Sequence, residues 1–153
     1  MYGTDIDSSS IAWCREHLDS ERYQVTHIKG PLPFADATFD LCYGFSVITH
    51  LPHEAETYWF SEIARVLKPG QYFIFSTHGE AFRNWLTAKD QAKFDLGKRV
   101  EWHPEGAGSN TCATFHPASY LLRHVHPAFE FVDYIPQGAL GNPVQDLWLW
   151  RKK

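Results

Sequence analysis

The chain has 153 residues, of which 44% are hydrophobic and 21% charged, a composition that fits one compact domain and excludes a disordered chain. The formal net charge is -4 and no run of Lys or Arg occurs before residues 151–153, which argues against nucleic acid as a partner. No apolar stretch reaches the roughly 20 residues that span a bilayer, and three scattered cysteines suggest free thiols, so we expect a cytoplasmic protein without membrane contact.

The first part of the chain alternates strand and helix patterns. Residues 2–6 have the pattern of a strand end, and Asp7 is a natural N-cap for a helix over residues 8–18. Residues 23–28 form a second strand candidate, which glycine and proline residues then interrupt.

The clearest patterns lie in the middle of the chain. Residues 39–46 are nearly all apolar, as expected for a strand that is covered on both faces. Residues 52–67 carry apolar side chains at helical spacing, and Lys68-Pro69-Gly70 ends this helix because proline cannot continue it. We expect another buried strand at residues 72–77 and a short helix at residues 80–86.

The last third of the chain begins with a stretch, residues 87–108, that mixes charge with aromatic residues and glycines. We expect a loop or lid there, as an insert over about residues 87–110. Residues 117–126 predict a helix, and residues 129–135 and 145–151 predict two final strands. Strands that alternate with helices and are followed by two adjacent strands indicate an α/β fold, with a mostly parallel sheet and an antiparallel hairpin at one edge.

Four segments occur in a characteristic order. They are Tyr2-Gly3-Thr4-Asp5-Ile6-Asp7; Leu32-Pro33-Phe34 followed by Phe39-Asp40-Leu41; Phe45-Ser46-Val47-Ile48-Thr49-His50-Leu51; and Glu62-Ile63-Ala64-Arg65-Val66-Leu67-Lys68-Pro69-Gly70. In this order they resemble the class I S-adenosylmethionine-dependent methyltransferase family, whose corresponding helix exit usually has a second glycine where this chain has Gln71. The order and spacing of the set carry the resemblance, because each segment alone is weak.

The resemblance implies a Rossmann-like methyltransferase sheet, with residues 1–153 as a single partial domain truncated before the second strand. The family's first strand and its glycine-rich cofactor loop, where a side chain would block the approach of the cofactor, have no counterpart in this sequence. That strand is central in the family's sheet. We therefore expect an exposed sheet region through which the chain forms a homo-oligomer.

The resemblance also implies S-adenosyl-L-methionine as the cofactor. Asp5, at a strand end, would accept hydrogen bonds from the ribose hydroxyls, and the alternative is a helix-capping or solvated acid. Ile6, Leu32 and Pro33 would enclose the adenine ring, or they could simply fill the core. The residues that would end a strand beside the methyl donor are Gly44, Phe45 and Ser46.

Four polar residues are candidates for the acceptor side. His50 could act as a base on an acceptor hydroxyl, since its ordinary pKa is near neutrality, or it could hydrogen-bond a loop backbone. His78, His116 and Gln145 are candidates for the acceptor pocket, and each could instead be a polar group with a structural partner. The nearest histidine pair, His124-x-His126, has no Cys or acid spaced to complete a ligand set, so no metal is predicted.

These observations predict a methyltransferase that acts on a small-molecule or sugar-like acceptor, in a reaction that depends mainly on positioning the two reactants. Two alternatives stay open. The chain could be a non-catalytic, truncated fragment or pseudoenzyme that self-associates without binding cofactor. It could also be a nicotinamide-dependent oxidoreductase, which ends its second strand with an acid in the same way, although Leu32-Pro33-Phe34 and residues 65–70 argue against that class.

Overall fold

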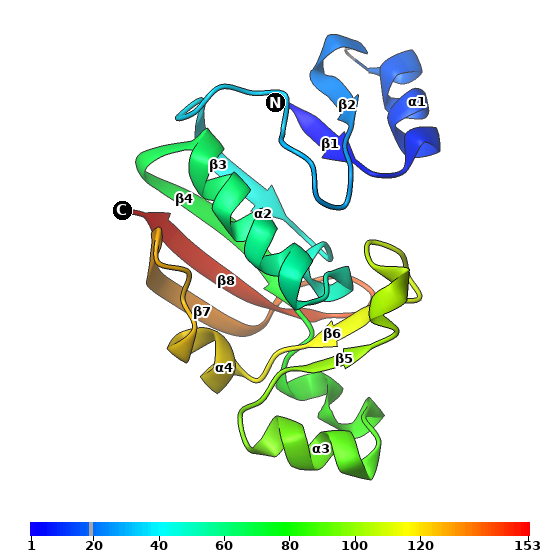
Figure 1. Cartoon of the computed structure of the whole chain (residues 1–153), viewed down its shortest axis with the longest axis vertical. Helices are drawn as coiled ribbons and strands as arrows, with labels where there is room; N and C mark the ends of the chain where they lie inside the picture. The colour runs from blue at the N-terminus through cyan, green and yellow to red at the C-terminus, as the bar shows by residue number, and fades with distance from the viewer. Residues whose placement is uncertain (19) are drawn as a thin grey trace. The chain divides into compact units, whose positions relative to one another are not determined.

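The computed structural model describes residues 1–18 and 20–153 (Figure 1) and divides the chain into two compact units, Met1–Phe34 and Ala35–Lys153. Each unit has its own sheet. In the part of the chain that is described, no helix is both long and apolar enough to span a membrane. Cys14, Cys42 and Cys112 are free thiols, as the scattered pattern suggested.

The first unit is a small strand–helix–strand arrangement. It contains β1 (Gly3–Asp5), α1 (Ser8–His17), η1 (Ser20–Arg22) and β2 (Tyr23–Val25), and the two strands are parallel. Asp7 caps α1 as predicted, because its Oδ1 accepts the backbone N–H of Ser9 at 2.9 Å. The second strand is shorter than residues 23–28, since β1 offers no pairing partner beyond Asp5.

The second unit is built around a four-stranded sheet. Its elements are β3 (Phe39–Gly44), η2 (Ile48–His50), α2 (His53–Val66), β4 (Leu67–Thr77), η3 (Glu80–Trp85), α3 (Ala88–Asp95), β5 (Val100–Trp102), η4 (Pro104–Gly106), β6 (Ala113–Phe115), α4 (Ala118–Arg123), β7 (Phe129–Ala139) and β8 (Gln145–Lys152). The strand order is β3-β4-β8-β7; β3 and β4 are parallel, and β8 is antiparallel to both of its neighbours. The α/β fold with a C-terminal antiparallel hairpin is therefore confirmed.

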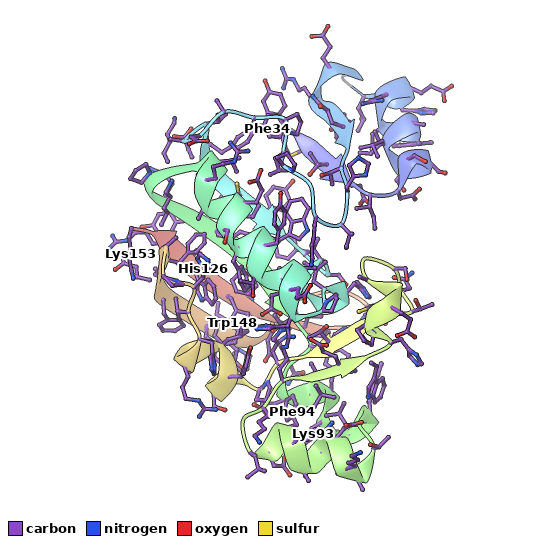
Figure 2. All side chains as sticks on the ribbon, viewed as in Figure 1. Phe34, Lys93, Phe94, His126, Trp148 and Lys153 are labelled. Atoms are coloured by element: carbon purple, nitrogen blue, oxygen red, sulfur yellow. The ribbon has the colours of Figure 1, made fainter. Side chains whose placement is uncertain are left out.

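Aromatic side chains fill the space between α2 and this sheet. Figure 1 shows α2 lying across one face of the sheet, and Figure 2 shows Trp148 on β8 in the middle of the unit. The ring centroid of Phe60 lies 4.9 Å from that of Trp150 and 5.6 Å from that of Phe75. All four of these rings are buried, and each buried ring of this size contributes about 1.5–3 kcal/mol to folding.

Two sequence-based expectations about this unit are wrong. The stretch expected to be a loop contains α3 and β5, because Thr87 caps α3 and Phe94 anchors it in a cluster of buried apolar side chains. A helix with so few apolar positions gives only a weak periodic signal, and a lid role for this stretch stays a prediction. Within the unit, β3 is also an edge strand whose Leu41 and Tyr43 are 49% and 52% exposed, so it is not covered on both faces. Self-association through the sheet stays a prediction.

Candidate functional site

The carboxyl ends of the parallel strands β3 and β4 meet at one edge of the four-stranded sheet. Gly44 at the end of β3 pairs with Phe75, and Thr77 at the end of β4 pairs with Asp146 near the start of the antiparallel strand β8. The loops that leave β3 and β4 therefore lie beside the beginning of β8. In open α/β sheets this edge is where ligands bind.

Three neutral side chains at this edge form a closed hydrogen-bonded ring, which we call the serine–glutamine ring. The backbone N–H of Ser46 donates to Ser76 Oγ at 2.8 Å, and Ser76 Oγ donates to Gln145 Oε1 at 2.6 Å. Gln145 Nε2 then donates to Ser46 Oγ at 3.0 Å. Ser46 has a left-handed backbone with φ of 57°, which costs on the order of 1 kcal/mol or more for a residue with a side chain, so the ring stabilises a strained turn. Ser46 and Gln145, predicted as cofactor and acceptor residues, are thus direct partners.

A buried carboxylate lies next to this ring and was not predicted from the sequence. Asp146 is 2% exposed and accepts hydrogen bonds from the hydroxyl of Tyr134 at 2.7 Å and from the backbone N–H of Gln137 at 2.9 Å. A Cβ at Gly79 would lie 1.7 Å from Asp146 Oδ2, so glycine leaves the space that the carboxylate fills. Burial, and then the hydrogen bond to Asp146, raise the pKa of Tyr134, which keeps its hydroxyl a donor.

His50 and His78 lie close together beside these loops. His50 Nδ1 donates to the carbonyl oxygen of Cys112 at 2.7 Å, so the neutral ring carries its proton on Nδ1 and leaves Nε2 as the basic atom. The backbone hydrogen bond expected for His50 is therefore present, and the same tautomer is the one that a general base needs. A catalytic role for His50 stays a prediction.

His78 is held in a mainly apolar environment. Its ring lies 4.3 Å from that of Phe82 and 5.3 Å from that of Phe115, with the His50 ring at 6.3 Å. Burial first, and then the proximity of His50 and His116, lower the pKa of His78 to about 4. The ring is thus neutral at neutral pH, and its Nδ1 has no hydrogen-bond partner among the described residues.

His116 belongs to a buried ion cluster rather than to an open surface. Its side chain is 0% exposed, and its Nε2 lies 2.7 Å from Glu56 Oε2, which also accepts a hydrogen bond from Arg99 Nη1 at 2.7 Å. Arg99 pairs in addition with Glu101, whose carboxylate accepts the backbone N–H of His53. Burial raises the pKa of Glu56, but the neighbouring His116 and Arg99 together lower it by more than burial raises it. The net pKa is therefore below its ordinary value, and the carboxylate is ionised. His116 thus has a structural partner, and its contact with an acceptor stays a prediction.

Comparisons with known proteins identify the family. Residues 1–75 match the family model described as a methyltransferase domain. Over 78 residues the chain is 36% identical to a probable S-adenosylmethionine-dependent methyltransferase of Mycolicibacterium smegmatis, a match that covers 50% of this chain and 29% of the relative. Residues 1–75, about half of the chain, therefore belong to the S-adenosylmethionine-dependent methyltransferase family. The chain spans less than a third of the length of that curated relative.

Solved structures of methyltransferases share this fold. A S-adenosylmethionine-dependent methyltransferase from Methanosarcina mazei matches with a TM-score of 0.67 at 20% identity, over 99% of this chain and 81% of that chain. Another from Mesorhizobium loti matches with a TM-score of 0.70 at 14% identity, over 99% of this chain and 79% of that chain. At these identities the likeness supports the Rossmann-like methyltransferase fold and carries no information about the acceptor.

The first unit carries the residues predicted to hold the nucleoside of the cofactor. Asp5 is the last residue of β1, its carboxylate is exposed, and its Oδ1 accepts the backbone N–H of Asp7 at 2.9 Å. Asp7 rather than Asp5 caps α1, so the helix does not account for Asp5. Its Oδ2 has no hydrogen bond within the described residues, and an oriented carboxylate oxygen of this kind fits the hydroxyls of a ribose.

The apolar candidates differ in exposure. Leu32 is buried, Pro33 is exposed, and Ile6 is 38% exposed. In the second unit, Phe45 is about half exposed, with its ring 5.8 Å from that of Tyr43. A contact of any of these side chains with S-adenosylmethionine stays a prediction.

A Cβ at Gly44 would meet only Val47, at an ordinary 3.6 Å, so the chain itself does not require glycine there. Among the residues that the structure describes, no three His, Cys, Asp or Glu side chains come together in a metal-binding arrangement.

Proposed function

We propose that this chain contributes the nucleoside-binding and acceptor-facing parts of an S-adenosylmethionine-dependent methyltransferase that modifies a small-molecule or sugar-like acceptor. One observation carries the proposal, which is Asp5 at the tip of β1 with one carboxylate oxygen held by Asp7 N–H and the other available to a ribose. The match of residues 1–75 to the methyltransferase domain supports it, because Asp5 lies within that match. A small acceptor suits a chain with net charge -4 and no internal basic run.

The residues of the chain would have separate roles in this reaction. When bound, the cofactor supplies a methyl group on a positively charged sulfur. Asp5 would bind the ribose hydroxyls, and the turn at Ser46, fixed by the serine–glutamine ring, would shape the edge of the sheet at which the acceptor is positioned. His50 would take a proton at Nε2 from an acceptor hydroxyl, because its Nδ1 is already committed to the Cys112 carbonyl. Much of the rate enhancement in such a transfer would come from proximity and orientation.

Calorimetric titration of the chain with S-adenosylhomocysteine tests the proposal. We expect saturable binding that Asp5→Asn weakens about tenfold, since a charged acceptor of two hydroxyl hydrogen bonds becomes neutral. Asp133→Asn is the matched control, because Asp133 is also exposed and also accepts a local backbone N–H, from Tyr134 at 2.8 Å. The control should bind like the unsubstituted chain.

The absence of any binding heat or thermal shift would contradict the proposal and leave the non-catalytic alternative. An equal loss in the Asp5 and Asp133 variants would contradict the role of Asp5 specifically. Once binding is established, a second assay tests the acceptor class. It measures transfer of a labelled methyl group to a panel of small hydroxylated compounds and sugars, with an oligonucleotide as the comparison acceptor.

A further inference from the structure

A pocket of about 500 Å³ opens in the second unit, and its lining includes none of the residues predicted to hold cofactor or acceptor. It lies where the segment between α3 and β5 passes beside α4 and the start of α2 (Figure 1). α3 itself, which carries Lys93 and Phe94 in Figure 2, leads into this segment. The polar lining of this cationic pocket comes from His53, Lys98, Arg99, Tyr120, Arg123 and His124.

The positive charges of the cationic pocket are only partly neutralised. Arg99 is paired with the carboxylates of Glu56 and Glu101. Lys98 and Arg123 have no carboxylate within ion-pairing distance in the described part of the chain, and both are exposed. The pocket therefore presents two uncompensated cations to solvent, which is the charge that a phosphate dianion would balance.

Arg123 is also fixed in position before any ligand binds. Its Nη2 donates to the carbonyl oxygen of Gly97 at 2.9 Å. Gly97 has a φ of 68°, and a Cβ there would lie 2.3 Å from Arg123 Nη2, so glycine both adopts the turn and lets the guanidinium approach the backbone. The rings of Tyr120 and His124 stack at 4.3 Å and form a flat wall beside it. A fixed guanidinium loses less freedom on binding an anion than a mobile one.

We infer that the cationic pocket binds the phosphate group of a small metabolite, with Lys98 and Arg123 as its charged contacts. Arg123 donates from its remaining guanidinium N–H groups, whereas Lys98 supplies a point charge on a flexible stem. This site is separate from the proposed cofactor site, since the pocket is lined by a different set of residues. Phosphate binding at the cationic pocket can therefore be tested independently of S-adenosylhomocysteine binding.

Titration of the whole chain with pyrophosphate and with citrate, at constant ionic strength and in the millimolar range, tests this inference. We expect saturable binding of pyrophosphate, weaker binding of citrate, and a loss of about tenfold in pyrophosphate affinity for Lys98→Ala. Lys89→Ala is the matched control, because Lys89 is an exposed lysine near the start of α3 that does not line the pocket. It removes the same charge and should leave the affinity unchanged.

Three results would overturn the inference. The first is that pyrophosphate does not bind at constant ionic strength. The second is an equal loss of pyrophosphate affinity in the Lys98 and Lys89 variants, which would indicate general electrostatic attraction. The third is tighter binding of citrate than of pyrophosphate. Both variants change an exposed lysine, so folding should be preserved, and their thermal unfolding curves check this directly.

Discussion

Two polar clusters of the second unit are built from different chemistry. The serine–glutamine ring at the sheet edge uses neutral groups, and each member both receives and gives hydrogen bonds. The ion cluster of Glu56, Arg99 and His116 is buried and charged, with one carboxylate shared by two cation-forming side chains. Loss of one neutral member leaves unpaired dipoles, whereas loss of one charged member leaves an uncompensated charge in the interior. The first arrangement fixes geometry where a ligand is expected, and the second fixes the β5–β6 region against α2.

The largest effect is expected from Glu56→Gln. The variant keeps the shape of the side chain but removes the charge that faces Arg99 and His116, and breaking a buried pair in this way costs about 3–5 kcal/mol of unfolding free energy. Urea denaturation at neutral pH measures the loss. Glu105→Gln is the control, since the carboxylate of Glu105 is 74% exposed and its removal should change stability by less than about 0.5 kcal/mol.

A smaller loss of unfolding free energy, which depends on pH, is expected when His78, next to the ion cluster, is protonated. The pKa of His78 is about 4 in the folded chain and about 6.5 when unfolded, so between these values the unfolded state binds more protons. The contribution of neutral His78 to the unfolding free energy is therefore fully present above about pH 6.5, and it is lost as the pH falls from there through pH 4. The difference of 2.5 pH units corresponds to about 3 kcal/mol at most.

Urea midpoints measured from pH 7 to pH 4 check this expectation. The variant His78→Gln cannot titrate, so the slope over this range should flatten whatever its stability at pH 7. The exposed His103 provides the control, and His103→Gln should keep the slope of the unsubstituted chain. An unchanged slope in the His78 variant would show that other groups cause the acid sensitivity.

Much of the fold could be predicted because local signals agree with tertiary packing. The helix at residues 52–67 has apolar side chains at regular spacing and a proline–glycine stop, and α2 spans His53–Val66. The final two strands carry alternating aromatic residues and form the β7–β8 hairpin. By contrast, α3 depends on Thr87 and the single buried anchor Phe94, a signal too weak to be read without its packing partners.

The candidate site could be predicted only residue by residue. Motif order indicated Ser46, and Gln145 was an acceptor candidate, but their mutual hydrogen bond joins positions 99 residues apart and has no local signal. His116 looked like a possible acceptor residue, and only the fold shows that it faces Glu56, 60 residues away. Asp146 was overlooked because nothing in its neighbours shows that Tyr134 and Gly79 surround it.

The smallest of the three stability effects is expected for Gln145→Leu, which tests the neutral half of the comparison. The variant keeps the side-chain volume, but Ser76 loses its acceptor and Ser46 Oγ loses its donor, a cost of about 1–2 kcal/mol in urea denaturation. The control Gln71→Leu changes a glutamine of β4 whose side chain makes no hydrogen bond within the described residues, and it should stay within about 0.5 kcal/mol. A loss as large as that of Glu56→Gln would mean that the strained turn at Ser46 depends on Gln145 as strongly as the interior depends on its ion cluster. In that case the distinction between a cluster that fixes geometry and one that balances charge would not hold.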